Sequence, residues 1–158
     1  MNPDQKLDQK IATLGWKLPP APKPVGLYKP VLFVGNLAYV SGHGPLKEGG
    51  SLMLGRVGAD LDVAGGQAAA KQTALAMLAT LQSQLGSLDR LVRIVKTLGL
   101  VRCTDDFGQS PLVINGFSQV FVDLLGSDLG IGARSALGTN SLPNGMAVEV
   151  EAIFEVRP

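Results

Sequence analysis

Two hydrophobic periods run along the chain and separate its helices from its strands. Over residues 63–85, leucines recur near one face of a helix in an Ala- and Gln-rich stretch, and Gly86 follows as a stop signal. A second helical stripe covers residues 112–125 and closes at Gly126. The pattern therefore predicts two amphipathic helices. In the second, the positions expected to face the core are Val113, Phe117, Val120, Phe121 and Leu124.

Other stretches follow the two-residue period of strands. Two β-rich runs, residues 31–34 and 37–42, flank Gly35-Asn36, which predicts a hairpin. Residues 91–101 alternate imperfectly and predict a strand with Val92, Ile94, Leu98 and Leu100 on one side and Arg93, Val95 and Thr97 on the other. Residues 147–156 alternate cleanly, and their polar side carries Glu149, Glu151, Ile153 and Glu155.

The N-terminal part has neither period for long. Leu7, Ile11 and Leu14 predict a short amphipathic helix over residues 2–14, ending at Gly15. Residues 18–24 are too rich in proline for a helix and predict an extended segment that lies over the domain. We therefore divide the chain into an N-terminal helix and extended arm, residues 1–20, and an α+β domain, residues 21–158.

The order of these elements predicts an α+β fold with a mixed sheet of at least four strands. Two helices can cover only one face of such a sheet. The other face would carry Val95 and Ile153 together with Lys96, Glu149 or Glu151, a surface that suits a subunit interface with a polar pocket. Residues 43–62 are rich in Gly and predict a long loop, without the spacing of a phosphate-binding loop.

Composition narrows the function classes. The chain has 158 residues, of which 46% are hydrophobic and 17% charged, so disorder is excluded and one domain is expected. A formal net charge of +1 disfavours nucleic-acid binding, and no apolar stretch reaches the length of a membrane span. His43 and Cys103 are the only residues of their kinds, which excludes an internal disulfide, a catalytic triad and a multi-His zinc site in one chain. A reducing, cytoplasmic setting fits this composition.

Six segments together resemble one family. They are residues 21–28, 37–42, 95–97, 114–117, 133–136 and 148–153, and the most specific are Ala133-Arg134-Ser135-Ala136 and the Val-Glu-Val-Glu-Ala ending. Their order is similar to that of the Rid family, the YjgF-type reactive intermediate deaminases, in a longer subgroup. The resemblance implies a chorismate-mutase-like fold with two helices on one face of the sheet, assembled as a homotrimer around a barrel with a pocket at each subunit boundary. It also implies hydrolysis of enamines and imines to 2-keto acids and ammonia without a metal or organic cofactor.

The resemblance assigns catalytic roles to Arg134 and Glu149. A guanidinium holds a carboxylate through two parallel hydrogen bonds, so Arg134 is expected to bind the substrate carboxylate. The alternative is an interface salt bridge from Arg134 to Glu149 or Glu151. A carboxylate can orient water and move a proton, which is the role implied for Glu149, with Glu151 as the rival residue on the same face.

Three further residues are expected to bind the substrate, each with a structural alternative. Tyr28 matches a family tyrosine, although Leu27 replaces a common proline, and its alternative is an interface rim. Ser41 could donate to a carboxylate or bond to neighbouring backbone, and Asn115 could bond in the pocket or at a helix start. Ala136 departs from the family pattern, because several active members carry Cys or Thr there.

Two function classes remain open. The first is an imine or enamine deaminase whose partner is a small carboxylate-bearing imine or keto acid. The second is a trimeric, non-catalytic binder of small carboxylate metabolites, which the departure at Ala136 favours. Ribonuclease activity has little support from the near-neutral charge and the single histidine.

Overall fold

A computed structural model describes residues 6–158 of the chain. Its helices and strands, in chain order, are α1 (Leu7–Thr13), β1 (Val31–Val34), β2 (Leu37–His43), α2 (Val63–Leu85), β3 (Leu91–Arg102), α3 (Ser110–Leu129), β4 (Ala133–Thr139) and β5 (Val148–Val156). Short 3-10 helices at Leu88–Arg90 and Pro143–Gly145 lead into β3 and β5.

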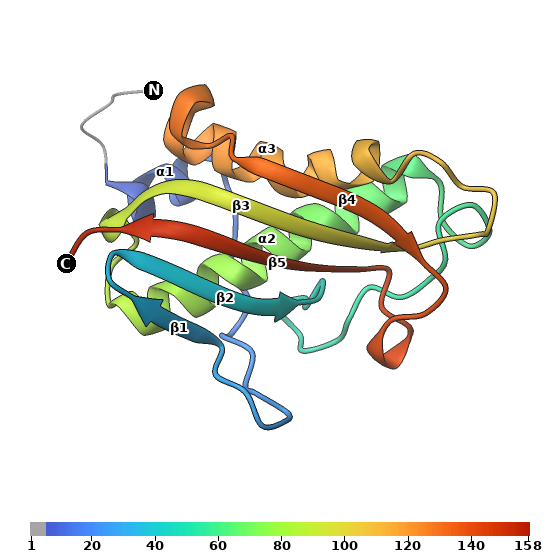
Figure 1. Ribbon diagram of the computed structural model, residues 1–158, viewed down its shortest axis with the longest axis horizontal. Helices are drawn as coiled ribbons and strands as arrows, with labels where there is room; N and C mark the ends of the chain where they lie inside the picture. Colours follow the sequence, from blue (N-terminus) through green and yellow to red (C-terminus); the bar gives the residue numbers. More distant parts are fainter. Residues whose placement is uncertain (1–5) are drawn as a thin grey trace.

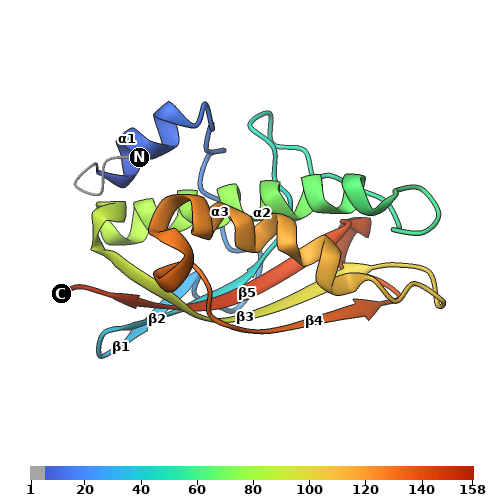
Figure 2. The same cartoon turned by 90° about the horizontal axis from the view of Figure 1, so that it is seen from above.

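The five strands form one sheet in the order β1-β2-β5-β3-β4 (Figure 1). All neighbours are antiparallel except β3 and β4, which run parallel. Because a parallel pair needs a crossover connection, α3 lies between them in the chain and packs back onto the sheet. Both α2 and α3 cover the same face, as Figure 2 shows. We call the opposite side the open face.

The core lies between this helix layer and the sheet. Phe117 and Phe121 of α3 and Phe154 of β5 are fully buried, with successive ring centroids 5.1 and 5.2 Å apart. Every second residue of β5, from Val148 to Val156, points into this core. The intervening residues of β5 therefore point to the open face.

The structure confirms the hairpin and the bounds of the helix over residues 63–85, but this helix is not amphipathic along its length, because every residue from Thr73 to Leu81 is buried. Val34 pairs with Leu37 across the turn, where Gly35 has a φ of 59°. Helix α2 ends at Leu85 because Gly86 adopts a left-handed conformation with a φ of 78°. In α3 the helical dihedrals break at Gly126, as expected, but one further helical stretch continues to Leu129.

Strand β4 is absent from the sequence prediction. Its sequence, Ala-Arg-Ser-Ala-Leu-Gly-Thr, has small side chains and no clear alternation, so the two-residue period gives no signal. The strand forms because it pairs with β3 over seven positions at the edge of the sheet. The prediction of at least four strands is met by five.

The predicted facing of β3 is wrong for its second half. Leu98 and Leu100 were expected to share a face with Ile94, yet Ile94 is buried under the helices while Leu98 lines a cavity on the open face. The cause is an irregularity in the pairing with β5 between Ile94 and Lys96, which changes which residues face the core. Thr97, Gly99 and Val101 consequently lie on the helix side.

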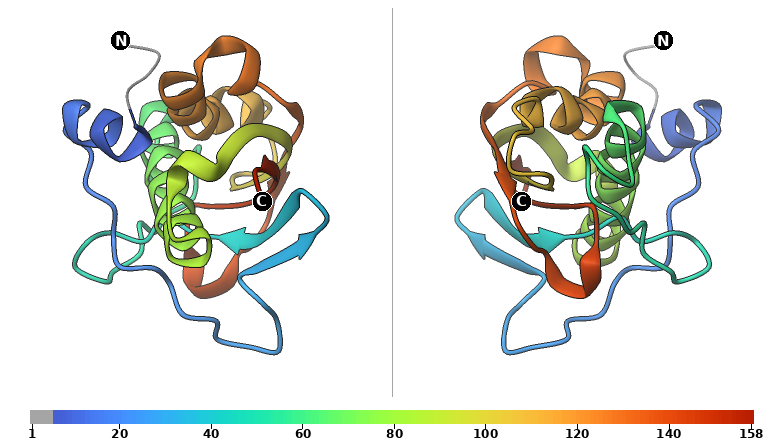
Figure 3. Two further views of the ribbon diagram at one scale, coloured as in Figure 1. Left: turned by 90° about the vertical axis from the view of Figure 1, so that its left-hand side faces the viewer. Right: turned by 90° about the vertical axis from the view of Figure 1, so that its right-hand side faces the viewer.

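The N-terminal segment packs outside the helix layer (Figure 3). Leu7 and Ile11 of α1 are buried, and the backbone N–H of Leu7 donates to Asp89 Oδ1 at 2.8 Å. The predicted helix over residues 2–14 is seen from Leu7 onward, whereas residues 2–5 lie outside the described part. Within residues 6–158, no helix is long and apolar enough to cross a membrane.

Gly116 of α3 lies where the two long helices pack closely against each other's backbone. A Cβ atom at Gly116 would contact the carbonyl oxygen of Gln67 in α2 and lie 2.9 Å from its carbonyl carbon. Backbone cannot give way as a side-chain end can, so Gly116→Ala should lower the free energy of unfolding by about 1–3 kcal/mol. Urea unfolding followed by circular dichroism measures this change. Gly49→Ala, which meets no atom within 4 Å, is the matched control, and equal stability of the two variants would contradict the packing.

Candidate functional site

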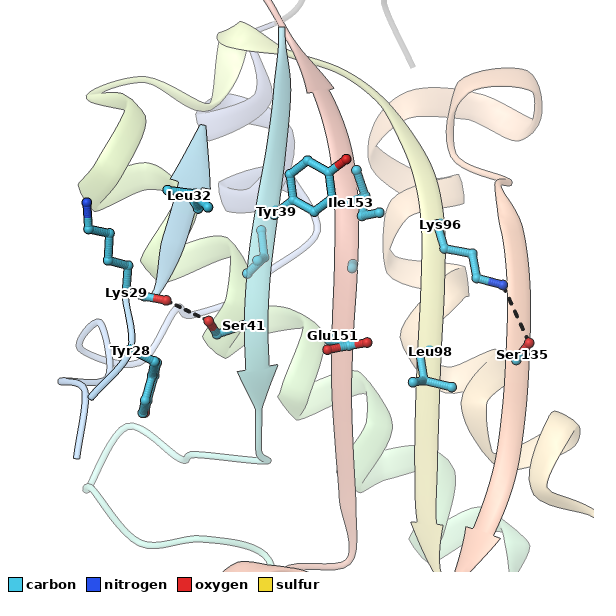
Figure 4. A pocket seen from close by; sticks show the side chains of 12 residues that line it. Tyr28, Lys29, Leu32, Tyr39, Ser41, Lys96, Leu98, Ser135, Glu151 and Ile153 are labelled. Carbon is cyan, nitrogen blue, oxygen red and sulfur yellow. Dashed lines mark hydrogen bonds between the residues drawn. The ribbon is translucent and has the colours of Figure 1, made fainter. Parts of the chain in front are cut away.

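A cavity of about 900 Å³ lies on the open face of the sheet (Figure 4). Its floor comes from β2, β5 and β3, and one wall comes from the segment before β1. Apolar side chains dominate the lining, with a few polar groups among them. The side chains drawn there include Tyr28, Leu32, Tyr39, Ser41, Lys96, Leu98, Ser135, Glu151 and Ile153.

Two predicted substrate-binding residues, Tyr28 and Ser41, line this cavity. The Ser41 hydroxyl donates to the carbonyl oxygen of Lys29 at 2.6 Å, and the Ser41 N–H donates to Pro30 at 3.0 Å. These bonds tie the loop that carries Tyr28 to strand β2. The hydroxyl proton of Ser41 is therefore used in a hydrogen bond to the backbone. This is the alternative to substrate binding that the sequence left open for Ser41.

Glu149 lies on the open face, one alternate position along β5 from Glu151. Its side chain is half-buried and lies against the backbone of Gly42 in β2. Burial raises the pKa of Glu149, and the negative charge of Glu151 raises it further. A carboxyl whose pKa moves toward neutrality is better suited to exchange a proton with water than an exposed one.

Arg134 and Asn115 lie on the other side of the sheet. They line a second cavity of about 470 Å³, between β4 and α3. The Arg134 guanidinium donates to Asn115 Oδ1 at 2.8 Å, to Ser118 Oγ at 3.2 Å and to the carbonyl oxygen of Pro111 at 3.3 Å. All three acceptors are uncharged, so they orient the guanidinium without neutralising it.

One chain does not bring Arg134 and Glu149 together. Arg134 of β4 pairs with Thr97 of β3, and Glu149 of β5 pairs with Leu100 of β3. Strand β3 therefore lies between Arg134 and Glu149, and the two are also offset along it. They also point to opposite faces, because Arg134 contacts α3 whereas Glu149 faces away from the helices. Arg134 and Glu149 therefore do not pair within one chain, and the interface salt bridge stays a prediction.

Sequence reasoning missed Ser118, whereas it placed Lys96 on the uncovered face of the sheet without giving it a role in the site. Ser118 lies three residues after Asn115, so both reach Arg134 from one face of α3, and this i, i+3 spacing is the signal that could have found it. Lys96 lies on the open face, where its Nζ is 3.5 Å from Ser135 Oγ. His43 is buried and hydrogen-bonded, which indicates a structural role.

Residues 8–148 match the model of a family described as "YjgF/chorismate mutase-like, putative endoribonuclease". The chain belongs to the Rid family. A curated relative, Protein TCP17 of Trypanosoma cruzi, is 40% identical over 146 residues, which are 92% of this chain and 91% of the relative. The fold class expected from the resemblance is thereby confirmed at the level of the single chain.

Two solved structures show how the chain relates to other members. The Agrobacterium tumefaciens protein Atu1372, of unknown function, is 38% identical with a TM-score of 0.87, over 96% of this chain and 92% of that one. RidA from a Psychrobacter species is 30% identical with a TM-score of 0.60, over 86% of this chain and 94% of that one. The higher score and coverage with Atu1372 agree with a longer subgroup of the family.

Within residues 6–158, no three His, Cys, Asp or Glu side chains lie close enough together to hold a metal ion. Cys103 is a buried free thiol. The residues that line the two cavities offer carboxylate, guanidinium, ammonium, hydroxyl, amide and backbone groups as donors and acceptors.

The raised pKa of Glu149 has a consequence for stability. A carboxyl whose pKa is higher in the folded state than in the unfolded state stabilises the fold when it is protonated. This stabilisation is complete below the unfolded pKa, which is about 4, and it is lost as the pH rises through the folded pKa. Gln resembles the protonated form. Glu149→Gln should therefore increase the free energy of unfolding at pH values above the raised pKa and leave it almost unchanged at about pH 4.

Urea titrations at the two pH values, at one protein concentration, measure this difference. Glu48→Gln, at an exposed loop position, is the matched control. A Glu149→Gln gain that is the same at both pH values would contradict the raised pKa.

Proposed function

We propose that the protein hydrolyses reactive enamines and imines of 2-amino acids to 2-keto acids and ammonia. Membership of the Rid family supports this class of reaction. The observation that carries the proposal is the Arg134 guanidinium, held at the sheet edge by three uncharged acceptors beside an open cavity.

Arg134 suits a substrate carboxylate for electrostatic reasons. A planar guanidinium binds a carboxylate through two parallel hydrogen bonds, which fixes the substrate plane as well as its position. Asn115, Ser118 and Pro111 accept from the two terminal nitrogens of Arg134 and limit how its side chain can rotate. Its full positive charge is left for a ligand.

Glu149 is proposed to handle the water. The enamine first tautomerises to the imine, whose C2 carbon is electrophilic. Glu149 accepts a proton as the water oxygen attacks C2, the C=N electron pair moves to nitrogen, and nitrogen takes up a proton. The proton that nitrogen takes up is the one that Glu149 accepted from water. In the resulting carbinolamine the hydroxyl proton passes through Glu149 to the same nitrogen, the C–N bond breaks, ammonia leaves and the C=O bond of the keto acid forms, so Glu149 ends as the free carboxylate. Holding water and imine in reacting geometry accounts for much of the expected acceleration.

The proposal requires two copies of the chain at each site. Arg134 and Glu149 point to opposite faces of one sheet, so a ligand that touches both must lie between neighbouring subunits. The open face carries half-exposed apolar side chains, such as Leu32 and Tyr39, that a second copy could cover. We propose the homotrimer of the family, in which Arg134 and Asn115 of one copy meet Glu149 and Tyr28 of the next.

A second candidate function is a non-catalytic binder of small carboxylate metabolites. It rests on Ala136, two residues after Arg134, which has no side-chain hydrogen-bonding group where several active members carry Cys or Thr. A binder would need Arg134 but not Glu149.

Ammonia release from freshly generated 2-imino acids tests the deaminase. The purified protein should accelerate release over a sample without protein. Arg134→Ala should lose about 100-fold in 2-keto acid affinity, because charge-assisted hydrogen bonds disappear, and Arg134→Lys should recover little of it. Glu149→Gln should lower turnover by about 100-fold while 2-keto acid affinity stays near that of the wild type.

Light scattering controls for assembly in these assays. Wild type and variants should share a mass of about three times the 16.5 kDa of one chain. Equal ammonia release with and without the wild-type protein, together with intact 2-keto acid binding, would contradict the deaminase function and support the non-catalytic binder.

A further inference from the structure

The pairing between β2 and β5 is interrupted next to Glu149. Val40 pairs with Ala152 and His43 pairs with Val150, so Ser41 and Gly42 together stand opposite the single residue Glu151. An extra residue of this kind is a β-bulge, which bends the strand and redirects neighbouring side chains. The bulge lies on the strand that borders the proposed water-activating carboxylate.

The only histidine of the chain holds this bulge from the helix side. His43 is 6% exposed, its Nδ1 lies 2.6 Å from the carbonyl oxygen of Ser41, and its Nε2 lies 2.8 Å from Thr80 Oγ1 in α2. A carbonyl oxygen can only accept, so Nδ1 carries a proton. Burial lowers the pKa of His43 and favours the neutral ring, so Nε2 accepts from the Thr80 hydroxyl. The neutral ring thus connects the bulge to the rigid helix α2.

The bulge places Gly42 directly against the Glu149 side chain. A Cβ atom at Gly42 would contact Glu149 Oε1 and lie 3.1 Å from Cδ and 3.3 Å from Cγ. Gly42 is not among the glycines with a positive φ, so its backbone conformation is open to other residues. Because position 42 has no side chain, the Glu149 carboxylate can occupy the space beside it.

We infer that Gly42 and His43 are positioning residues for Glu149, with the bulge fixing where its carboxylate lies and Gly42 giving it room to lie there. The link to turnover rests on the proposed function, whereas the placement of the carboxylate stands on the contacts alone. Burial raises the pKa of Glu149, and the charge of Glu151, on the same face of β5, raises it further.

The first test is a double-mutant cycle. Gly42→Ala pushes the Glu149 carboxylate away and should lower kcat about tenfold with little change in KM. Glu149→Asp retracts the carboxylate by one methylene and should also cost about tenfold. Because the shorter side chain leaves room for the added methyl group, the double variant should be no worse than either single one. Gly108→Ala, which meets no atom within 4 Å, should match the wild type.

The second test does not depend on turnover. Carbon-13 NMR titration of the Glu149 carboxyl, assigned with Glu149→Gln, reports its surroundings directly. Gly42→Ala should move the titration toward the ordinary range of a glutamate. Thr80→Val, which removes the hydroxyl bonded to His43, should also shift it, whereas Thr73→Val, another buried threonine of α2 bonded only to Ala69, should not.

The outcomes separate the two proposals. A Glu149 titration that is unchanged in Gly42→Ala overturns the positioning role, and additive kinetic losses in the cycle do the same. An unchanged titration in Thr80→Val overturns the part assigned to His43. A shifted titration with no ammonia release from any variant, wild type included, upholds the positioning and overturns the deaminase.

Discussion

The arrangement of this protein depends on a sheet whose helices cover only one of its faces. Alternate residues of each strand then have different surroundings, because one set is buried in the core and the other faces solvent or a second molecule. In β5 this alternation buries Phe154 and leaves Glu149 outside. In β4 it turns Arg134 toward α3. The two residues of the proposed site are therefore on opposite sides of their own sheet.

Each of the two is nevertheless held firmly before any partner arrives. Arg134 is oriented by neutral acceptors on α3, which keep its charge available. Glu149 rests on a bulge that a neutral, buried histidine connects to α2. In the proposed site between two chains, such preorganisation would lower the cost of ordering the side chains on binding. The single histidine contributes to this arrangement without meeting the reacting atoms.

The sequence was most informative where one period dominated. The helix over residues 63–85 and the strand over 147–156 follow from strong repeats, and Gly86 ends the helix as expected. Strand β4 was missed because its pairing with β3, not its own pattern, makes it a strand. The residue types of the site came from resemblance. Their partners could not be predicted, because two irregularities in the pairing of β3 with β5 and the bulge in β2 decide which face of the sheet neighbouring residues are on.

Mixing two inactive variants tests most directly whether each site is shared between copies. Arg134→Ala keeps Glu149, and Glu149→Gln keeps Arg134, so a site between the two variants can still combine both intact residues. After unfolding and refolding together in equal amounts, the mixture should recover about a quarter of wild-type ammonia release, because random assembly pairs the intact residues at that frequency. Activity no higher than the mean of the separate variants would contradict a site built from two chains.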